Sequence, residues 1–173
     1  MDLDQTYPGN ANGLMSERLA HALMQEIEGT ADFLINLHTM NALFESRVYA
    51  VYKVHPDSPM PEEQMLRFIS LFEPNVACRM DVGGKGELPG NIAGALDYQC
   101  LARGIPAFML ELGGGSRYEA GNVAQAERGF ARLAASLSIM ATPEGDQSPR
   151  RDPVVHTGER AAFVAQQWDE LAW

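Results

Sequence analysis

The chain has 173 residues, enough for one compact domain with a sizeable core. Its formal net charge is -10, and no cluster of lysine and arginine could neutralise phosphates, which argues against nucleic-acid binding. No apolar run approaches the roughly 18 residues that a membrane span needs, and the acidic N-terminus lacks the apolar segment of a signal peptide. The two cysteines, Cys78 and Cys100, lack metal-binding spacing and are expected to be buried free thiols. We therefore expect a cytoplasmic protein with no nucleic-acid and no membrane partner.

The first half of the chain is predicted to form two helices and three strands after a loop of turn-forming residues (1–15). Ser16 has the character of a helix N-cap, and apolar residues repeat at helical spacing until Gly29. A second helix opens at Pro61, where the glutamates that follow suit a helix N-terminus. Three apolar, β-forming runs predict strands at residues 33–37, 47–54 and 75–80.

The second half continues the alternation of helices and strands. Helix-like sequence runs over residues 92–103, Gly104 follows as a stop, and an apolar run predicts a strand at residues 107–112. A long helix is predicted from 119 to 140, and residues 142–153 have the composition of a linker. This alternation predicts an α/β fold with a mostly parallel or mixed sheet flanked by helices.

Two polar residues stand out at the predicted strand ends. His38 closes the first strand, and Glu111 lies near the end of the last. Ligands gather where the carboxyl ends of parallel strands meet, so we expect the two side chains to face one cleft. An imidazole suits zinc, and a nearby carboxylate suits a general base. Two plainer interpretations stay open: His38 hydrogen-bonded to a backbone carbonyl, and Glu111 in an ion pair with Arg117 or Arg103.

Four short segments of the chain match, in order, the motifs of one enzyme family. They resemble the succinylglutamate desuccinylase/aspartoacylase family of the zinc carboxypeptidase-like superfamily. That family carries an N-x-N-R-x-F-P-G stretch, a Ser-Glu-Arg-x-Ala helix, a strand ending in Asp-Leu-His-Thr, and a Glu-x-Gly-Gly motif. The corresponding segments here are residues 2–9, 16–20, 36–39 and 111–114, and the resemblance covers about residues 2–140.

The resemblance implies a zinc-dependent deacylase that cleaves the amide bond of a small N-acyl amino acid or a related amide. By position, it implies that His38 is the third zinc ligand. It also implies that Glu111 is the base that activates water and then protonates the amine. This agrees with the interpretation from the residues, because zinc lowers the pKa of water and a carboxylate can handle the protons.

The substrate-binding residues are also predicted from the resemblance. Asp4 and Gln5 occupy the positions of the family's Asn-Arg, so this chain lacks a cationic clamp for a substrate carboxylate there. Arg117 is predicted at the rim of the cleft because it follows the glycine run, and Arg79 because it lies at a predicted strand end. Asn36 replaces the aspartate that the family places two residues before its zinc histidine.

The family supplies its other two zinc ligands from an H-x-x-E motif well before the N-x-N-R stretch, and this chain starts almost at that stretch. We therefore expect residues 1–142 to be a partial zinc carboxypeptidase-like catalytic domain. Residues 143–173 are expected to be a linker and short tail, or the cut-short start of a second domain. The chain alone is expected to show little or no hydrolysis, and a truncated, inactive paralogue is the alternative. An open sheet edge would also favour a homo-oligomer.

A second H-x-x-E spacing occurs near the end of the chain, at His156 and Glu159. Two specified residues are a weak signal, so chance is the better interpretation. A zinc site built from them would need His38 within a few ångströms of the same point.

Overall fold

The computed structural model describes residues 2–40, 46–55, 58–81, 92–115, 117–141 and 152–157. Its helices and strands follow one another along the chain largely as the sequence predicts. In order they are η1 (Leu3–Gln5), α1 (Met15–Thr30), β1 (Leu34–Met40), β2 (Val48–Val54), α2 (Glu62–Ser70), β3 (Val76–Asp81), η2 (Ile92–Gly94), α3 (Leu96–Leu101), β4 (Ala107–Gly114), α4 (Ala120–Ser136) and β5 (Val154–His156), where η1 and η2 are single 3-10 turns.

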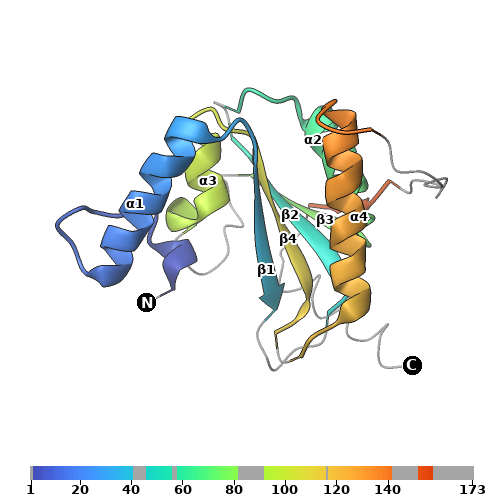
Figure 1. Cartoon of the computed structure of the whole chain (residues 1–173), viewed down its shortest axis with the longest axis horizontal. Helices are drawn as coiled ribbons and strands as arrows, with labels where there is room; N and C mark the ends of the chain where they lie inside the picture. Colours follow the sequence, from blue (N-terminus) through green and yellow to red (C-terminus); the bar gives the residue numbers. More distant parts are fainter. Residues whose placement is uncertain are drawn as a thin grey trace.

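Within these residues, five strands form one mixed sheet in the order β1-β4-β2-β3-β5 (Figure 1). The pairs β1/β4, β2/β3 and β3/β5 are parallel, whereas β2 runs antiparallel to β4. The predicted α/β fold with a mixed sheet is confirmed. β5 lies in the segment assigned to linker and tail, where no strand was predicted, and it extends the sheet beside β3.

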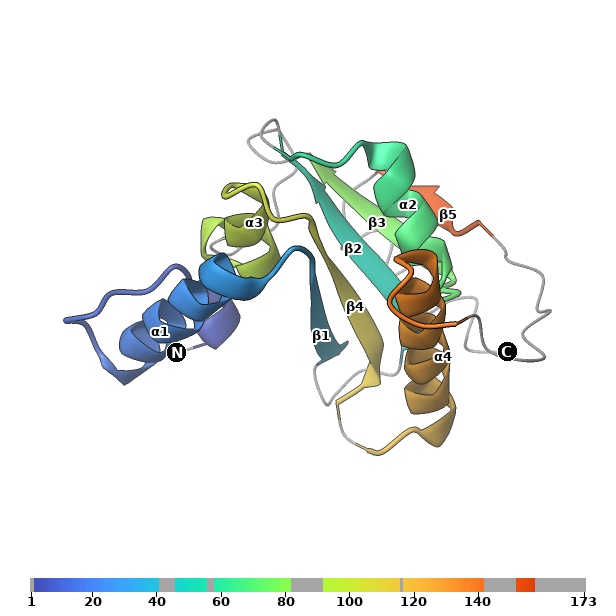
Figure 2. The same ribbon diagram turned by 45° about the horizontal axis from the view of Figure 1, so that its top comes forward.

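Helices cover the sheet in two groups. α2 and α4 lie against one face of the sheet (Figure 2), where Phe72 makes edge-to-face contacts with Phe108 of β4 and Phe130 of α4. α1 and α3 lie together near the start of β1 and β4, away from α2 and α4 (Figure 1), and α3 contacts both strands. Among the described helices, none combines the length and apolar character needed to cross a bilayer.

The two faces of the sheet carry different side chains, because successive residues of a strand point to opposite sides. The face under α2 and α4 contributes Ala50, Tyr52, Ala77, Phe108 and Leu110 to the main buried core. The opposite face carries a smaller buried cluster. This cluster consists of Tyr49, Val51, Val76, Cys78 and Met109.

Two predicted helix boundaries differ from the structure. α1 begins at Met15 rather than after Ser16, because the Glu17 carboxylate accepts the N–H of Leu14 at 2.6 Å and makes Leu14 the N-cap. The helix predicted over residues 92–103 is divided into η2 and α3 by Ala95, whose backbone is extended. This interruption exposes the N–H of Leu96 to a partner outside the helix, and that partner belongs to the candidate site.

Candidate functional site

His38 and Glu111 lie side by side on adjacent strands. They are Cα partners in the parallel pair β1/β4, and Tyr49 of β2 is the Cα partner of Glu111 on its other side. Neighbouring strands are about 4.8 Å apart, and partners in register point to the same face. The three side chains therefore form a row across β1, β4 and β2, with Glu111 in the middle. The register thus places His38 and Glu111 on one face of one sheet, as expected, whereas a cleft that both side chains face stays a prediction.

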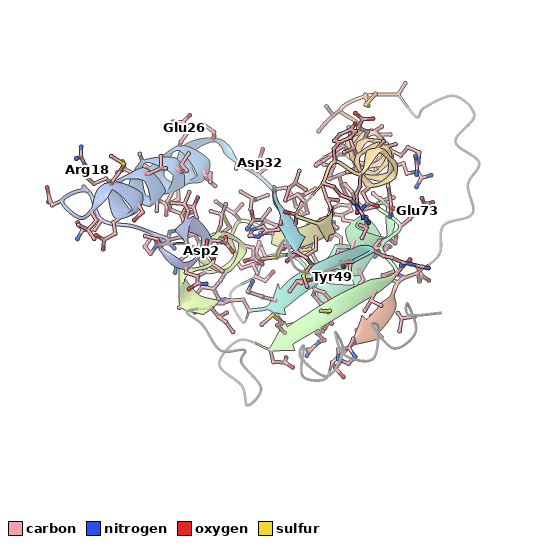
Figure 3. The ribbon with its side chains drawn as sticks, turned by 90° about the horizontal axis from the view of Figure 1, so that it is seen from below. Asp2, Arg18, Glu26, Asp32, Tyr49 and Glu73 are labelled. Atoms are coloured by element: carbon pink, nitrogen blue, oxygen red, sulfur yellow. The ribbon has the colours of Figure 1, made fainter. Side chains whose placement is uncertain are left out.

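Glu111 is buried between a polar and an apolar neighbour. Glu111 is only 5% exposed to solvent, and Tyr49 is only 3% exposed. Tyr49 lies on β2 (Figure 3), and its hydroxyl donates a hydrogen bond to Met40 Sδ of β1 at 3.0 Å. Because β4 lies between β2 and β1, this bond carries the tyrosine side chain across β4 on the face of Glu111. Tyr49 thus covers part of β4 on the face that carries Glu111.

Asp4 approaches His38 from η1, the turn near the N-terminus. Its Oδ2 lies 3.6 Å from His38 Nε2, and both side chains are partly buried. Its Oδ1 accepts hydrogen bonds from the Asn36 side-chain amide at 2.9 Å and from the Leu96 N–H at 3.1 Å. The carboxylate is therefore held by β1 and by the first residue of α3.

Burial raises the pKa of Asp4 above its ordinary value of 3.8. The hydrogen bond from Leu96, the nearby imidazole of His38 and the hydrogen bond from Asn36 act in the opposite direction, whereas the carboxylate of Asp97 raises the pKa further. Asp4 is thus a partly desolvated acid whose charged form is supported by specific donors.

Lys53 and Asp97 form a buried ion pair beside this group. Lys53 Nζ lies 2.6 Å from both carboxylate oxygens of Asp97, and Asp97 Oδ1 also accepts the N–H of Tyr98 at 3.0 Å. Asp97 directly follows Leu96, whose N–H binds Asp4. The pair therefore fastens the start of α3 to β2 and helps to fix the donor that holds Asp4.

Two further predicted substrate residues, Gln5 and Arg117, are exposed and contact residues close to them in the sequence. Gln5 is exposed on η1 and donates to Asp2 Oδ2 at 3.2 Å. Arg117 is largely exposed and pairs with Glu119 at 3.0 Å.

Arg79 requires a correction, because the structure separates it from His38 and Glu111. It is the Cα partner of Tyr52, which belongs to the core under α2 and α4, so it points to the face opposite Glu111. There its Nε binds Glu62 of α2 at 2.8 Å, and a second guanidinium nitrogen contacts Asp81.

A zinc site shared by His38 and His156 is contradicted by the order of the strands. His38 lies on β1 and His156 on β5, at opposite edges of the five described strands. Four strand spacings separate them, or about 19 Å. Glu159 lies outside the described residues.

Comparison with known proteins identifies the fold and the family. The family model of the succinylglutamate desuccinylase/aspartoacylase catalytic domain matches residues 1–137. The chain belongs to this family. No curated protein matches the sequence significantly.

Solved structures of desuccinylase/aspartoacylase proteins share the fold. The succinylglutamate desuccinylase/aspartoacylase of Rhodobacter sphaeroides has a TM-score of 0.70 at 22% identity, over 89% of this chain and 43% of that one. The product-bound ectoine utilization protein EutE (DoeB) of Ruegeria pomeroyi gives 0.70 at 18% identity, over 91% and 44%. A succinylglutamate desuccinylase from a Silicibacter species gives 0.69 at 17% identity, over 91% and 45%. The chain thus spans less than half the length of these proteins.

The donor atoms around His38 fit the zinc ion that the desuccinylase/aspartoacylase family implies only in part. His38 offers an imidazole nitrogen, and the carboxylate of Asp4 faces it. Within the described ranges, however, no group of three or more histidine, cysteine, aspartate or glutamate side chains is arranged to hold a metal ion. The described residues therefore provide two possible donor groups and not a complete ligand set for zinc.

Sequence reasoning did not identify Tyr49, Lys53 and Asp97 as parts of the site region. A signal for Lys53 was present, because a lysine inside the alternating strand of residues 47–54 must find a partner if that strand is buried. Tyr49 gave no such signal, since an aromatic residue in a strand is ordinary. Its relation to Glu111 depends on the pairing of β2 with β4.

Proposed function

We propose that this chain forms part of a zinc-dependent amide hydrolase acting on a small N-acyl amino acid or a related amide. The observation that carries the proposal is the register of His38 with Glu111 on adjacent parallel strands, in a chain of the desuccinylase/aspartoacylase family. His38 is assigned as a metal ligand and Glu111 as the general base. A zinc ion held by His38 supplies the Lewis acidity that polarises an amide carbonyl and lowers the pKa of water.

Glu111 carries the proton transfers in this proposal. It accepts a proton from water as the oxygen of that water forms a bond to the amide carbon. It then delivers the proton to the nitrogen as the C–N bond breaks, which yields a carboxylate and an amine. Its position supports the role, because Glu111 is buried and its register partners on the two adjacent strands are His38 and Tyr49.

The substrate roles of Asp4, Gln5 and Arg117 are part of the same proposal. η1 brings Asp4 to His38, and Gln5 is the next residue on that turn. Arg117 follows β4 by three residues, on the connection from Glu111 to α4. Arg79 is left out, because it faces the other side of the sheet.

A catalytically inactive paralogue is the second candidate. One observation favours it: the described residues place no three potential metal ligands together. On this alternative the sheet is retained, but the chain neither binds zinc at His38 nor hydrolyses amides.

The first experiment measures zinc binding by the 173-residue chain in a competition titration with a chromogenic chelator. Binding that is lost in His38→Ala and kept in His21→Ala, a histidine control on α1, would support His38 as a ligand. No binding by the parent chain would favour the inactive paralogue. Zinc binding that is the same in the parent and in His38→Ala would remove His38 as a ligand.

The second experiment measures hydrolysis of a panel of N-acyl amino acids. It compares the 173-residue chain with an extended chain, in which a family segment carrying the H-x-x-E motif is fused before Met1. We expect one bound zinc and hydrolysis in the extended chain, and little or no hydrolysis without the extension. An extended chain that is folded and binds zinc but cleaves none of the panel would support the inactive paralogue.

A further inference from the structure

One side of α1 is an exposed apolar strip. The helix is fixed to the core by its other side, where Ala20 and Met24 are buried. Met15, Leu19 and Leu23 follow one another at intervals of four residues and are between 39% and 86% exposed. Residues four apart are neighbours on a helix surface, so the three form a continuous strip, which we call the α1 stripe. Apolar side chains that gather on a surface in this way mark a site of protein association.

Two opposite charges lie along the α1 stripe, on either side of a small residue. Arg18 and Glu26 are both exposed, and they lie on the outer side of α1, away from α3 (Figure 3). Ala22 is exposed midway between them, four residues from each. The surface therefore has a small residue at its centre, a cation about 6 Å towards one end and an anion about 6 Å towards the other.

This arrangement is self-complementary when a second α1 runs antiparallel around a twofold axis at Ala22. Each residue then lies level with the residue that is equally far from Ala22 in the other direction. Arg18 lies level with the partner's Glu26, and the symmetry makes this pair twice. Leu19 and Leu23 lie about 4.5 Å and about 1.5 Å from the level of the axis, so the four leucines of the two copies alternate along the contact. A twofold interface needs a surface that complements itself in this way.

The outer ends of the α1 stripe also fit this arrangement. Met15 lies seven residues before Ala22, so it comes level with the partner's Gly29, which lies seven residues after it. A Cβ at Gly29 would meet nothing within 4 Å, so the surface there is open. An unbranched, flexible methionine side chain can occupy such a space.

We propose that the α1 stripe is the interface of a homodimer, in which two copies of α1 pack antiparallel around a twofold axis at Ala22. With 16 residues, α1 is about 24 Å long. A contact along one helix of this length is at the small end of specific interfaces, so we expect a reversible dimer with a micromolar dissociation constant. The inference does not depend on the proposed function, because no residue of the α1 stripe belongs to the candidate site.

The first test measures the dissociation constant of the 173-residue chain by sedimentation velocity, over concentrations that span the micromolar range. Leu19→Glu is compared with Leu137→Glu, a leucine of similar exposure at the C-cap of α4. We expect Leu19→Glu to raise the dissociation constant at least about tenfold, because the symmetry places two charges in the apolar contact. Leu137→Glu should leave it unchanged, and circular dichroism checks that both variants are folded.

The second test examines the direction of the two helices by charge reversal. Arg18→Glu and Glu26→Arg should each raise the dissociation constant by about two- to tenfold, because each places like charges level with one another. The double variant Arg18→Glu/Glu26→Arg should return it to the parent value, since both cross-dimer pairs are restored with the signs exchanged.

The third test examines the position of the twofold axis by cross-linking. Ala22→Cys brings two new thiols together at the axis, so mild oxidation should give a disulfide-linked dimer. Glu127→Cys, an exposed position on α4, is the control and should not cross-link. The native Cys78 and Cys100 are buried and should take no part. This test keeps the proposal falsifiable if Leu19→Glu does not fold.

Three results would overturn the proposal. A parent chain that stays monomeric at all concentrations would mean that a second copy does not cover the α1 stripe. A dimer that Leu19→Glu leaves unchanged would place the interface on another surface. A dimer that Leu19→Glu weakens, but that neither regains affinity in the double charge reversal nor cross-links through Ala22→Cys, would rule out the antiparallel pairing of α1 with itself.

Discussion

Lys53 Nζ lies 2.6 Å from Asp97, and the two side chains are 4% and 0% exposed. The pair connects β2 to the start of α3, and α3 in turn carries the N–H that holds Asp4. Two charges so far from water depend on each other, because removal of one leaves the other buried and uncompensated. The local structure near Asp4 therefore depends on Lys53, which lies on β2.

We predict that Lys53→Met lowers the free energy of unfolding by about 3–5 kcal/mol, the usual effect of breaking a buried ion pair. The double variant Lys53→Met/Asp97→Leu should recover most of this loss, because it leaves no buried charge. Urea unfolding followed by circular dichroism measures both. If Lys53→Met is as stable as the parent, Asp97 finds another partner or takes up a proton without lowering the free energy of unfolding.

The second prediction concerns two glycines of α4. A Cβ at Gly129 would lie 2.1 Å from a ring carbon of Phe72, whereas a Cβ at Gly121 meets nothing within 4 Å. Gly129→Ala should therefore destabilise the fold by about 1–3 kcal/mol through overpacking. Gly121→Ala should be neutral or stabilising by up to about 1 kcal/mol, because alanine favours a helix. Thermal unfolding of the two variants provides the comparison, and equal effects would contradict the packing of Phe72 under α4.

The third prediction concerns alkaline pH. Burial, aided by the charge of Asp97, raises the pKa of the Cys100 thiol from 9.0 to about 12. The folded thiol thus keeps its proton after the unfolded thiol has lost it. Its contribution to stability is present below about pH 9 and is lost as the pH rises towards about 12. Tyr52 acts in the same direction, because burial and Glu62 raise its pKa.

Urea midpoints measured across this pH range should therefore fall, and they should fall less steeply in Cys100→Ala. In the parent, alkylation of Cys100 at mildly alkaline pH should be slow until urea is added, as peptide mapping by mass spectrometry can follow. Rapid alkylation of the folded chain would mean that the thiol is accessible and ionised.

The fourth prediction concerns the base. In the extended chain, Glu111→Gln should lower kcat by about 10²–10⁴-fold, the range that general base catalysis provides, while the zinc content stays the same. Glu127→Gln, an exposed position on α4, is the control. Turnover that survives Glu111→Gln would assign the proton transfer to another group.

The strands β1 to β4 could be predicted because each is a short apolar run, but their directions could not. The alternation in Val48–Val54 is the same whichever way the strand runs. The sequence pattern therefore does not indicate that β2 pairs with β4 in the antiparallel direction. β5 was missed because it has three residues and two of them are exposed. A run of that length does not differ from a linker by pattern alone.

Part of the candidate site could also be predicted from the sequence, and part could not. The pairing of His38 with Glu111 could be expected, because both residues stand near the ends of apolar strands. The position of Asp4 could not be deduced from local patterns, since its partners Asn36 and Leu96 are 32 and 92 residues away. Arg79 was misplaced because a strand-end position says nothing about which face a side chain takes. Alternation places it opposite its neighbour Cys78, but only the strand pairing shows that Cys78 shares the face of Glu111.

The strand order has a consequence for how the protein is made. β1 leaves the ribosome 73 residues before its partner β4, counted from Leu34 to Ala107. At translation rates of about 5–20 residues per second, this interval lasts about 4–15 s. Throughout it, the strand that carries His38 has neither its hydrogen-bonding neighbour nor Glu111 beside it. A nascent chain halted anywhere in that interval would display an unpaired apolar strand, a natural target for chaperones and for aggregation.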